Sequence, residues 1–149
     1  MADLKTNLLG FTMNSPIIGA SGTVGYGVEY EELADFSKIG GISGKGLTLY
    51  GQYGNKGERL WETPSGLINS IGLQNPGVAH LKEHDLPWLQ ARGATVIVNV
   101  SGHSFDEYVQ VIEALEDAPV DAYEVNISCP NVDAGGMTIG TSAASVEKV

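Results

Sequence analysis

The sequence predicts an α/β fold in which helices cover a parallel β-sheet. Three observations support this prediction: strand-like and helix-like segments alternate along the chain, the strand-like segments are nearly continuous apolar runs, and the composition suits one globular domain. Of the 149 residues, 42% are hydrophobic, 17% are charged and 20 are glycine, a level typical of folds with many tight turns. No repeat, linker or boundary divides the chain, so we treat residues 1–149 as a single domain.

The first two strand and helix pairs are expected before residue 91. Residues 16–20 (PIIGA) form a short β-branched run typical of a strand, and residues 29–39 carry apolar side chains at helical spacing. A second strand is expected at 41–47 and a second helix at 78–90. The stretch 50–75 is too long for an ordinary connection, and loops of this length are usually lids or binding loops. An ordered surface loop is the alternative.

The second half of the chain contains the clearest elements. Residues 94–100 (ATVIVNV) are typical of a buried strand, and residues 104–116 of an amphipathic helix for which Ser104 is a suitable N-cap. The apolar side of this helix is expected to consist of Phe105, Tyr108, Val109, Ile112 and Leu115. A fourth strand is expected at 122–127. Residues 141–149 resemble a loop that enters a fourth helix.

The number of strand and helix pairs narrows the architecture. A (β/α)₈ barrel needs about 250 residues, so four pairs in 149 residues correspond to half of one. A doubly wound domain could close at this length, but Gly22, Gly25 and Gly27 do not have the spacing of a dinucleotide-binding turn. We expect a chain of the TIM-barrel type that is cut short after about the first four β/α units.

Charge and composition exclude several classes of function. The net charge of −10 disfavours binding to nucleic acid, and no run approaches the length of about 18 apolar residues needed to span a membrane. The start of the chain has no targeting pattern, so a cytoplasmic location is expected. A single cysteine cannot form an internal disulfide, which leaves Cys129 as a free thiol. The histidines and carboxylates do not have metal-ligand spacing, so no metal site is expected.

Polar residues follow the end of each predicted strand. They are Ser21 with Gly22, Lys45 with Gly46, Asn99, and Asn126 with Cys129. Because the carboxyl ends of parallel strands form one rim, these residues are expected to converge on one ligand. Cys129 lies between the amides of Asn126 and Asn131, a combination of acid/base capacity with hydrogen-bond donors and acceptors for a planar polar ligand.

Each of these residues alone also has an ordinary structural explanation. An isolated cysteine is more often a small buried hydrophobe than a catalyst. Lys45 could be a solvated lysine at a strand end, although no other charge lies near it in the sequence, which equally suits a buried lysine facing an anion. Asn99 is costly to bury without partners, so either the local backbone or a ligand must satisfy it.

Several longer motifs together resemble one known family. They are IIGASGTVGYG, GKGLTL, ETPSGLINSIGLQNPGV, IVNVSG and EVNISCPNVDAGG. In this order and spacing they resemble the class 1 dihydroorotate dehydrogenases, most closely the class 1B catalytic subunits, and the resemblance covers essentially the whole chain as the N-terminal half of the family's barrel. One departure is Gly44, where many relatives are expected to have a hydroxyl residue before the lysine.

The resemblance implies an FMN-binding TIM barrel that oxidises (S)-dihydroorotate to orotate in pyrimidine biosynthesis. It implies that Cys129 is the general base. The implied substrate-binding residues are Lys45, Asn69, Ile71, Gly72, Leu73, Asn126 and Asn131. The implied FMN-binding residues are Ala20, Ser21, Lys45, Gly46, Asn99 and Asn126. The missing second half of the barrel leads us to expect poor FMN binding and no turnover from this chain alone.

The resemblance also implies partners, and it leaves alternatives open. Class 1B implies a homodimer and a heterotetramer with an electron-transfer subunit that carries FAD and an iron-sulfur cluster and passes electrons to NAD, whereas class 1A would use fumarate. Another FMN barrel acting on pyrimidines, similar to dihydropyrimidine dehydrogenase, is the nearest alternative. A second is an inactive half barrel that only self-assembles through its unpaired strand edges.

Overall fold

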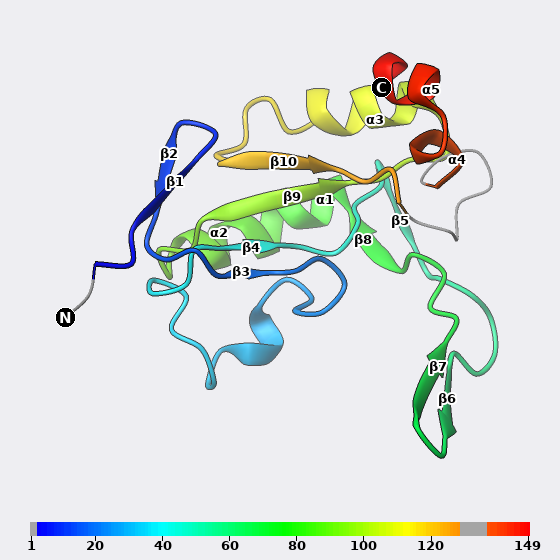
Figure 1. Ribbon diagram of the computed structural model, residues 1–149, viewed down its shortest axis with the longest axis horizontal. Helices are drawn as coiled ribbons and strands as arrows, with labels where there is room; N and C mark the ends of the chain where they lie inside the picture. Colours follow the sequence, from blue (N-terminus) through cyan, green and yellow to red (C-terminus); the bar gives the residue numbers. More distant parts are fainter. Residues whose placement is uncertain (1–2, 129–136) are drawn as a thin grey trace.

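A four-stranded parallel sheet forms the centre of the molecule. The computed structural model describes residues 3–128 and 137–149. The sheet contains β3 (Ile18–Gly19), β4 (Gly41–Ser43), β9 (Val96–Val100) and β10 (Ala122–Val125), arranged in that order (Figure 1). All three neighbouring pairs are parallel. The four predicted strands are therefore confirmed, although each is shorter than the apolar run that predicted it.

The two faces of the sheet differ in chemistry because side chains alternate along each strand. Ile42, Val96, Val98 and Val100 belong to the main hydrophobic core, and each is at most 3% exposed. The opposite face carries the residues that lie between them. Those residues are Ile97, which is paired with Ser43, and Asn99, which is paired with Glu124. One face is therefore apolar and covered, whereas the other presents polar groups.

The helix predicted at residues 78–90 covers the apolar face. It consists of α1 (Val78–His80), a π-helical turn η2 (Leu81–Asp85) and α2 (Leu86–Gln90). Pro87 explains the wide turn, because proline has no N–H and its ring clashes with the carbonyl four residues earlier in a regular α-helix. Leu81, Leu86 and Leu89 are nearly completely buried. The prediction of a helix here is confirmed, but its π-helical turn was not predicted.

The helix predicted at residues 104–116 is confirmed as α3 (Phe105–Glu113). Its N-cap is Ser104, whose Oγ accepts a hydrogen bond of 3.2 Å from the Glu107 amide. Tyr108, Val111 and Leu115 are buried, while Val109 is 52% exposed. Val109 was wrongly placed on the apolar side, because the buried stripe follows the spacing 108, 111, 115.

The prediction of a helix at residues 29–39 is wrong. Only a 3₁₀ turn, η1 (Val28–Tyr30), forms, and Leu33 is 81% exposed. The Asp35 carboxylate accepts hydrogen bonds from both the amide and the hydroxyl of Ser37. This local turn competes with helical hydrogen bonding. The first strand is therefore followed by irregular chain, which Phe36 anchors in the core together with the partly buried Ala34 and Ile39.

The long stretch after β4 contains regular structure of its own. The strands β5 (Tyr50–Gln52) and β8 (Asn75–Gly77) pair antiparallel, and between them β6 (Leu60–Thr63) and β7 (Gly66–Asn69) form a hairpin. In Figure 1 this hairpin projects from the body of the molecule. A buried amide closes the base of the stretch, since Asn75 Oδ1 accepts hydrogen bonds from the Thr48 and Gly77 amides.

The chain ends carry small elements. An N-terminal hairpin of β1 (Thr6–Leu8) and β2 (Phe11–Met13) was not predicted. At the other end, α4 (Met137–Gly140) precedes α5 (Ala143–Lys148), which confirms a helix beginning near residue 141. Within the described parts of the chain, no helix is long and apolar enough to cross a membrane.

Candidate active site at the carboxyl edge of the sheet

A short bulge after β4 brings Lys45 and Gly46 next to β9. The chain leaves the sheet after Ser43 and returns at Leu47, which bridges to Val100. The Leu47 amide donates to the Asn99 carbonyl at 2.8 Å, and the Ser101 amide donates to the Leu47 carbonyl at 2.8 Å. At the other end the Gly44 amide donates to the Ile97 carbonyl at 3.2 Å, so Lys45 and Gly46 have a fixed position at the carboxyl edge.

Gly46 is packed so closely that no side chain fits there. A Cβ atom at this position would lie 2.8 Å from Ser101 Oγ, 3.0 Å from Leu73 Cδ1 and 3.1 Å from Asn99 Oδ1. Asn99 lies on β9, Ser101 follows β9 and donates its amide hydrogen to the Leu47 carbonyl, and Leu73 belongs to the long stretch. Gly46 is therefore the point at which the sheet edge and residues 71–73 meet.

Two asparagine side chains at this edge are joined by a hydrogen bond. Asn126, directly after β10, donates from Nδ2 to Asn99 Oδ1 at 3.0 Å, and Asn99 Nδ2 donates to Glu124 Oε1. The register of the sheet makes this possible, since Asn99 lies directly beside Glu124. Asn99 is only 3% exposed. The prediction that the local backbone or a ligand satisfies Asn99 is wrong, because the side chains of Glu124 and Asn126 do so.

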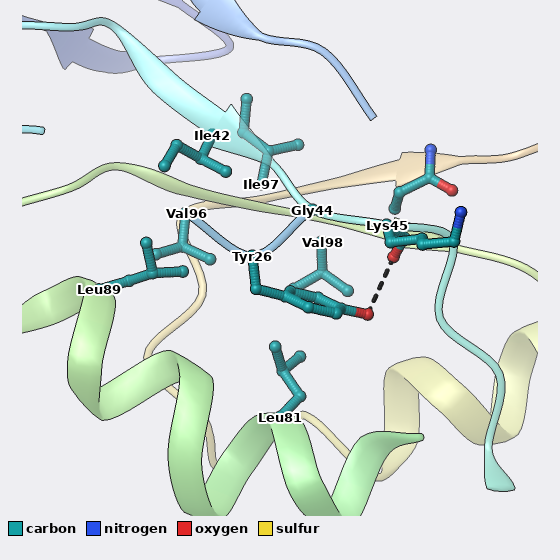
Figure 2. Close-up of a pocket in the computed structure, with 10 residues that line it drawn as sticks. Tyr26, Ile42, Gly44, Lys45, Leu81, Leu89, Val96, Ile97 and Val98 are labelled. Atoms are coloured by element: carbon teal, nitrogen blue, oxygen red, sulfur yellow. Dashed lines mark hydrogen bonds between the residues drawn. The ribbon is translucent and has the colours of Figure 1, made fainter. Parts of the chain in front are cut away.

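Lys45 lies beside a small cavity under the sheet edge (Figure 2). In the figure, the ring of Tyr26 lies between Leu81 on the helix and Val98 in the sheet, and its hydroxyl donates to the Lys45 carbonyl at 3.1 Å. Burial, with a smaller contribution from the charge of Asp85, strongly raises the pKa of Tyr26. Tyr26 is therefore a neutral hydrogen-bond donor that holds the backbone of Lys45.

The same tyrosine explains why residue 44 is glycine. A Cβ atom on Gly44 would lie 2.9 Å from two ring carbons of Tyr26. A serine or threonine at position 44 would therefore require the Tyr26 ring to move. The Tyr26 ring, from the loop after β3, occupies the space that a side chain at position 44 would need.

Asp85 is a buried carboxylate on the helix behind Tyr26. It is 8% exposed, and its Oδ2 accepts no hydrogen bond among the described residues. Burial raises the pKa of Asp85, although the nearby His80 and His84 act in the opposite direction. The distance from His80 Nε2 to Asp85 Oδ2 is 3.7 Å. This acid is a source of charge near the edge that the sequence did not reveal.

The long stretch contributes residues 71–73 to the edge. Lys45 and Ile71 both line an open cleft of about 850 Å³. Gly72 and Leu73 both have a left-handed backbone, with φ of 75° and 52°. Such a conformation is costly for leucine and is common where a backbone is shaped for function. Asn69 instead lies on β7, exposed and paired with Leu60, and does not line this cleft.

The predicted site residues therefore fall into four groups, one of which is Asn69 alone, on β7 outside the cleft. The structure brings together Lys45, Gly46, Leu73, Asn99 and Asn126 at one edge, with Ile71 and Gly72 close by in sequence. Ala20 and Ser21 follow β3 at the same end of the sheet, where the Ala20 carbonyl accepts from Thr23. Cys129 and Asn131 lie outside the described residues.

The sequence analysis missed three residues at the edge: Tyr26, Ser101 and Glu124. Ser101 could have been found, since it follows Asn99 by two positions on a strand and so shares its face. Glu124 could have been found only with the register of β9 and β10. No sequence signal indicated Tyr26.

The chain as a whole also matches a known family. Residues 3–149 match the family model described as dihydroorotate dehydrogenase. The chain belongs to the dihydroorotate dehydrogenase family.

Members of the dihydroorotate dehydrogenase family cover the whole chain. It is 48% identical over 149 residues to the protein named dihydroorotate dehydrogenase B (NAD(+)), catalytic subunit, from Petrotoga mobilis, covering 100% of this chain and 50% of that protein. The protein of the same name from Phocaeicola vulgatus is 45% identical over 150 residues, with the same coverage. The chain spans about half the length of these relatives and corresponds to their N-terminal half.

A solved structure supports the fold. The crystal structure of DHODH from Eimeria tenella in complex with ferulenol has a TM-score of 0.64, with 20% sequence identity. The match covers 88% of this chain and 38% of that one. At this identity the likeness concerns the fold alone. A parallel α/β sheet of the TIM-barrel type is thereby confirmed, with this chain covering part of it.

Proposed function

We propose that this chain supplies the first half of an active site that oxidises (S)-dihydroorotate to orotate in pyrimidine biosynthesis. Family membership supports this function, and one observation carries it: Gly46, Asn99 and Asn126 are held together at the carboxyl edge beside Lys45. Polar groups at this end of parallel strands are where such barrels bind ligands. The activity belongs to a protein that also contains the second half of the barrel.

FMN is the proposed cofactor, and the edge suits it. The amides of Asn99 and Asn126 match a ring with donors and acceptors. Ala20, Ser21 and the Lys45 ammonium complete the proposed contacts. When bound, FMN supplies the acceptor for the hydride that leaves the substrate. Lys45, a cation in a half-buried position, would stabilise negative charge that develops beside it.

The substrate is proposed to lie against Lys45 and residues 69–73. Lys45 has no ion pair within the described ranges, so its ammonium is available for the carboxylate of dihydroorotate. Leu73 packs against Gly46 at the edge, and the amides of Asn126 and Asn131 would bind the ring. Asn69 enters the proposal by resemblance alone, since β7 holds it outside the cleft that Lys45 and Ile71 line. Cys129 is proposed to take the proton from the substrate carbon C5, because a thiolate is a suitable base near neutral pH.

The proposal extends to the partners. A homodimer, and a heterotetramer with an iron-sulfur FAD subunit that passes electrons to NAD, are proposed from the relatives named as NAD(+)-dependent catalytic subunits. A cytoplasmic location is proposed with them. Within the four-stranded sheet that the structure describes, β3 and β10 are the edge strands, with a neighbour on one side only. An edge of this kind invites pairing, which supports self-association of the isolated chain.

A second candidate is a flavin enzyme that acts on an uncharged pyrimidine, similar to dihydropyrimidine dehydrogenase. The unpaired Lys45 argues against it, because an uncharged ring would leave that cation without an anionic partner. Orotate and uracil should therefore be compared as inhibitors. Inhibition by orotate that disappears in Lys45→Met supports the proposal, whereas stronger inhibition by uracil favours the second candidate.

The decisive experiment uses a full-length protein, made by joining this chain to the C-terminal half of the Petrotoga mobilis relative. Under anaerobic conditions, dihydroorotate should bleach the visible absorbance of bound flavin. Cys129→Ala should retain flavin and lose most of the bleaching rate, while Cys129→Ser should retain part of it. An unchanged rate in Cys129→Ala would contradict the role of Cys129 as base. A full-length protein that binds no flavin would contradict the proposed function.

A further inference from the structure

A few buried polar groups lack partners in the part of the chain that the structure describes. They are the hydroxyls of Ser43 and Ser101 and one carboxylate oxygen of Asp85. Asp85 has His80 nearby, whereas the serines have no such neighbour. Both serines are 1% exposed. Ser43 lies within β4, and Ser101 lies at the carboxyl edge of the sheet.

Ser101 is placed by its backbone and not by its side chain. Its amide donates to the Leu47 carbonyl, so the residue stays at the edge whatever its hydroxyl does. Since it follows Asn99 by two positions, both side chains lie on the same face. Both oxygens crowd the missing side chain of Gly46, at 2.8 Å for Ser101 Oγ and 3.1 Å for Asn99 Oδ1. Ser101 thus belongs to the site by position.

The neighbouring amide is already committed to other side chains. Asn99 donates to Glu124 and accepts from Asn126, so its orientation is fixed by two partners. Ser101 makes no comparable bond, although an unsatisfied buried hydroxyl is costly. The fold therefore gains nothing from this hydroxyl. A polar group that is buried and unpaired among the proposed ligand-binding residues is typical of a binding position.

We propose that Ser101 is a further FMN-contacting residue, whose hydroxyl forms a hydrogen bond to the bound flavin beside Gly46 and Asn99. The inference rests on the proposed function and adds a residue to it. A serine hydroxyl can donate or accept, so it suits either kind of atom at the edge of a flavin ring. Ser101 is a binding and positioning residue here and takes no part in proton transfer.

The test compares Ser101→Ala with Ser43→Ala in the full-length protein described above. Ser43→Ala is the matched control, because it also removes a buried, unpaired hydroxyl from the same face of the sheet. Flavin fluorescence gives the FMN dissociation constant, and thermal unfolding is measured without and with FMN. Ser101→Ala should raise the dissociation constant about fivefold to tenfold, the effect of one lost hydrogen bond. Ser43→Ala should leave it unchanged.

The two unfolding measurements separate a ligand contact from a structural role. Ser101→Ala should unfold at the same temperature as the parent without FMN, and FMN should raise that temperature less than in the parent. Equal FMN affinity in Ser101→Ala and the parent would overturn the role of Ser101 alone. The role of Ser101 would also be overturned if Ser101→Ala unfolds at a lower temperature than the parent without FMN and FMN then raises both temperatures equally. If the parent protein binds no FMN, the proposed function fails together with this inference.

Discussion

The carboxyl edge of the sheet and the β6–β7 hairpin differ in which side chains this chain buries. At the edge, polar side chains such as Asn99 are buried, and hydrogen bonds one or two residues away fix their backbone. In the hairpin, apolar side chains are exposed, with Trp61 at 64%, Leu67 at 69% and Ile68 at 63%. Exposed apolar groups and buried polar groups are both unusual in a finished globular protein.

The difference shows which part of the molecule is complete by itself. The edge obtains its shape from contacts within residues 41–126, so substitutions of its hydrogen-bonded or closely packed residues should change both stability and ligand binding. The hairpin has few contacts beyond its own two strands, so substitutions there should change the stability of this chain little.

The largest effect is expected from Gly46→Ala. The new methyl group would collide with Ser101, Leu73 and Asn99, which costs about 2–3 kcal/mol of unfolding free energy in a packed site. FMN binding should be lost as well. Denaturant unfolding and flavin fluorescence measure the two effects.

Gly57→Ala provides the control in the long stretch. Gly57 has open space around it but a φ of 81°, so the change should cost about 1 kcal/mol and leave FMN affinity unchanged. Similar losses of flavin in both variants would show that the edge has no special packing.

A second comparison uses two asparagines. Asn99→Ala removes a buried amide with two partners and should cost about 2 kcal/mol. Asn69→Ala, on the exposed hairpin, should change stability by less than about 0.5 kcal/mol. In the full-length protein both should weaken turnover, with Asn69→Ala acting mainly on the Michaelis constant. Equal stability losses would contradict the distinction between the two regions.

The sequence predicted the edge better than it predicted the elements around it. Strand ends can be located from apolar runs, so Lys45, Gly46, Asn99 and Asn126 were found because parallel strands end at one rim. The helix at 29–39 failed because the Asp35 side chain forms a turn that helical spacing does not reveal. Asn69 was grouped with the edge by resemblance, whereas the hairpin that carries it is set by antiparallel pairing that the sequence pattern did not indicate.

A smaller effect is expected from changing Asp85, which lies on the helix behind Tyr26. Its pKa is raised in the folded state, so the folded protein binds this proton more tightly than the unfolded chain. The stability it contributes is full below its unfolded pKa of about 4 and is lost as pH rises through the folded pKa. Asp85→Asn should therefore gain about 1 kcal/mol over the parent at neutral pH and little at pH 4.

Thermal unfolding of both proteins across this pH range measures the gain. Glu83→Gln serves as the control, because Glu83 is a mostly exposed carboxylate on the same helical turn. An advantage of Asp85→Asn that is constant with pH would contradict the assignment to this carboxylate.

The smallest effect is expected from Trp61→Ala combined with Ile68→Ala, a cross-strand pair in the hairpin. Stability of the isolated chain at low concentration should change by less than about 0.5 kcal/mol, since both side chains are mostly exposed. Unfolding should be measured at two protein concentrations. A loss that grows with concentration would show that another copy covers the hairpin, and a large loss at both would show that this chain covers it.

The π-helical turn between α1 and α2 has a consequence for chain length. Leu81 and Leu86 are five residues apart, yet both are buried on the same side of the helix, because the wide turn holds one residue more than a regular α-turn. Deleting the exposed Glu83 would bring the two leucines to the ordinary spacing of four. A one-residue gap in an alignment at this helix would therefore mark a change in winding, while the leucines on either side would still occupy the same positions against the sheet.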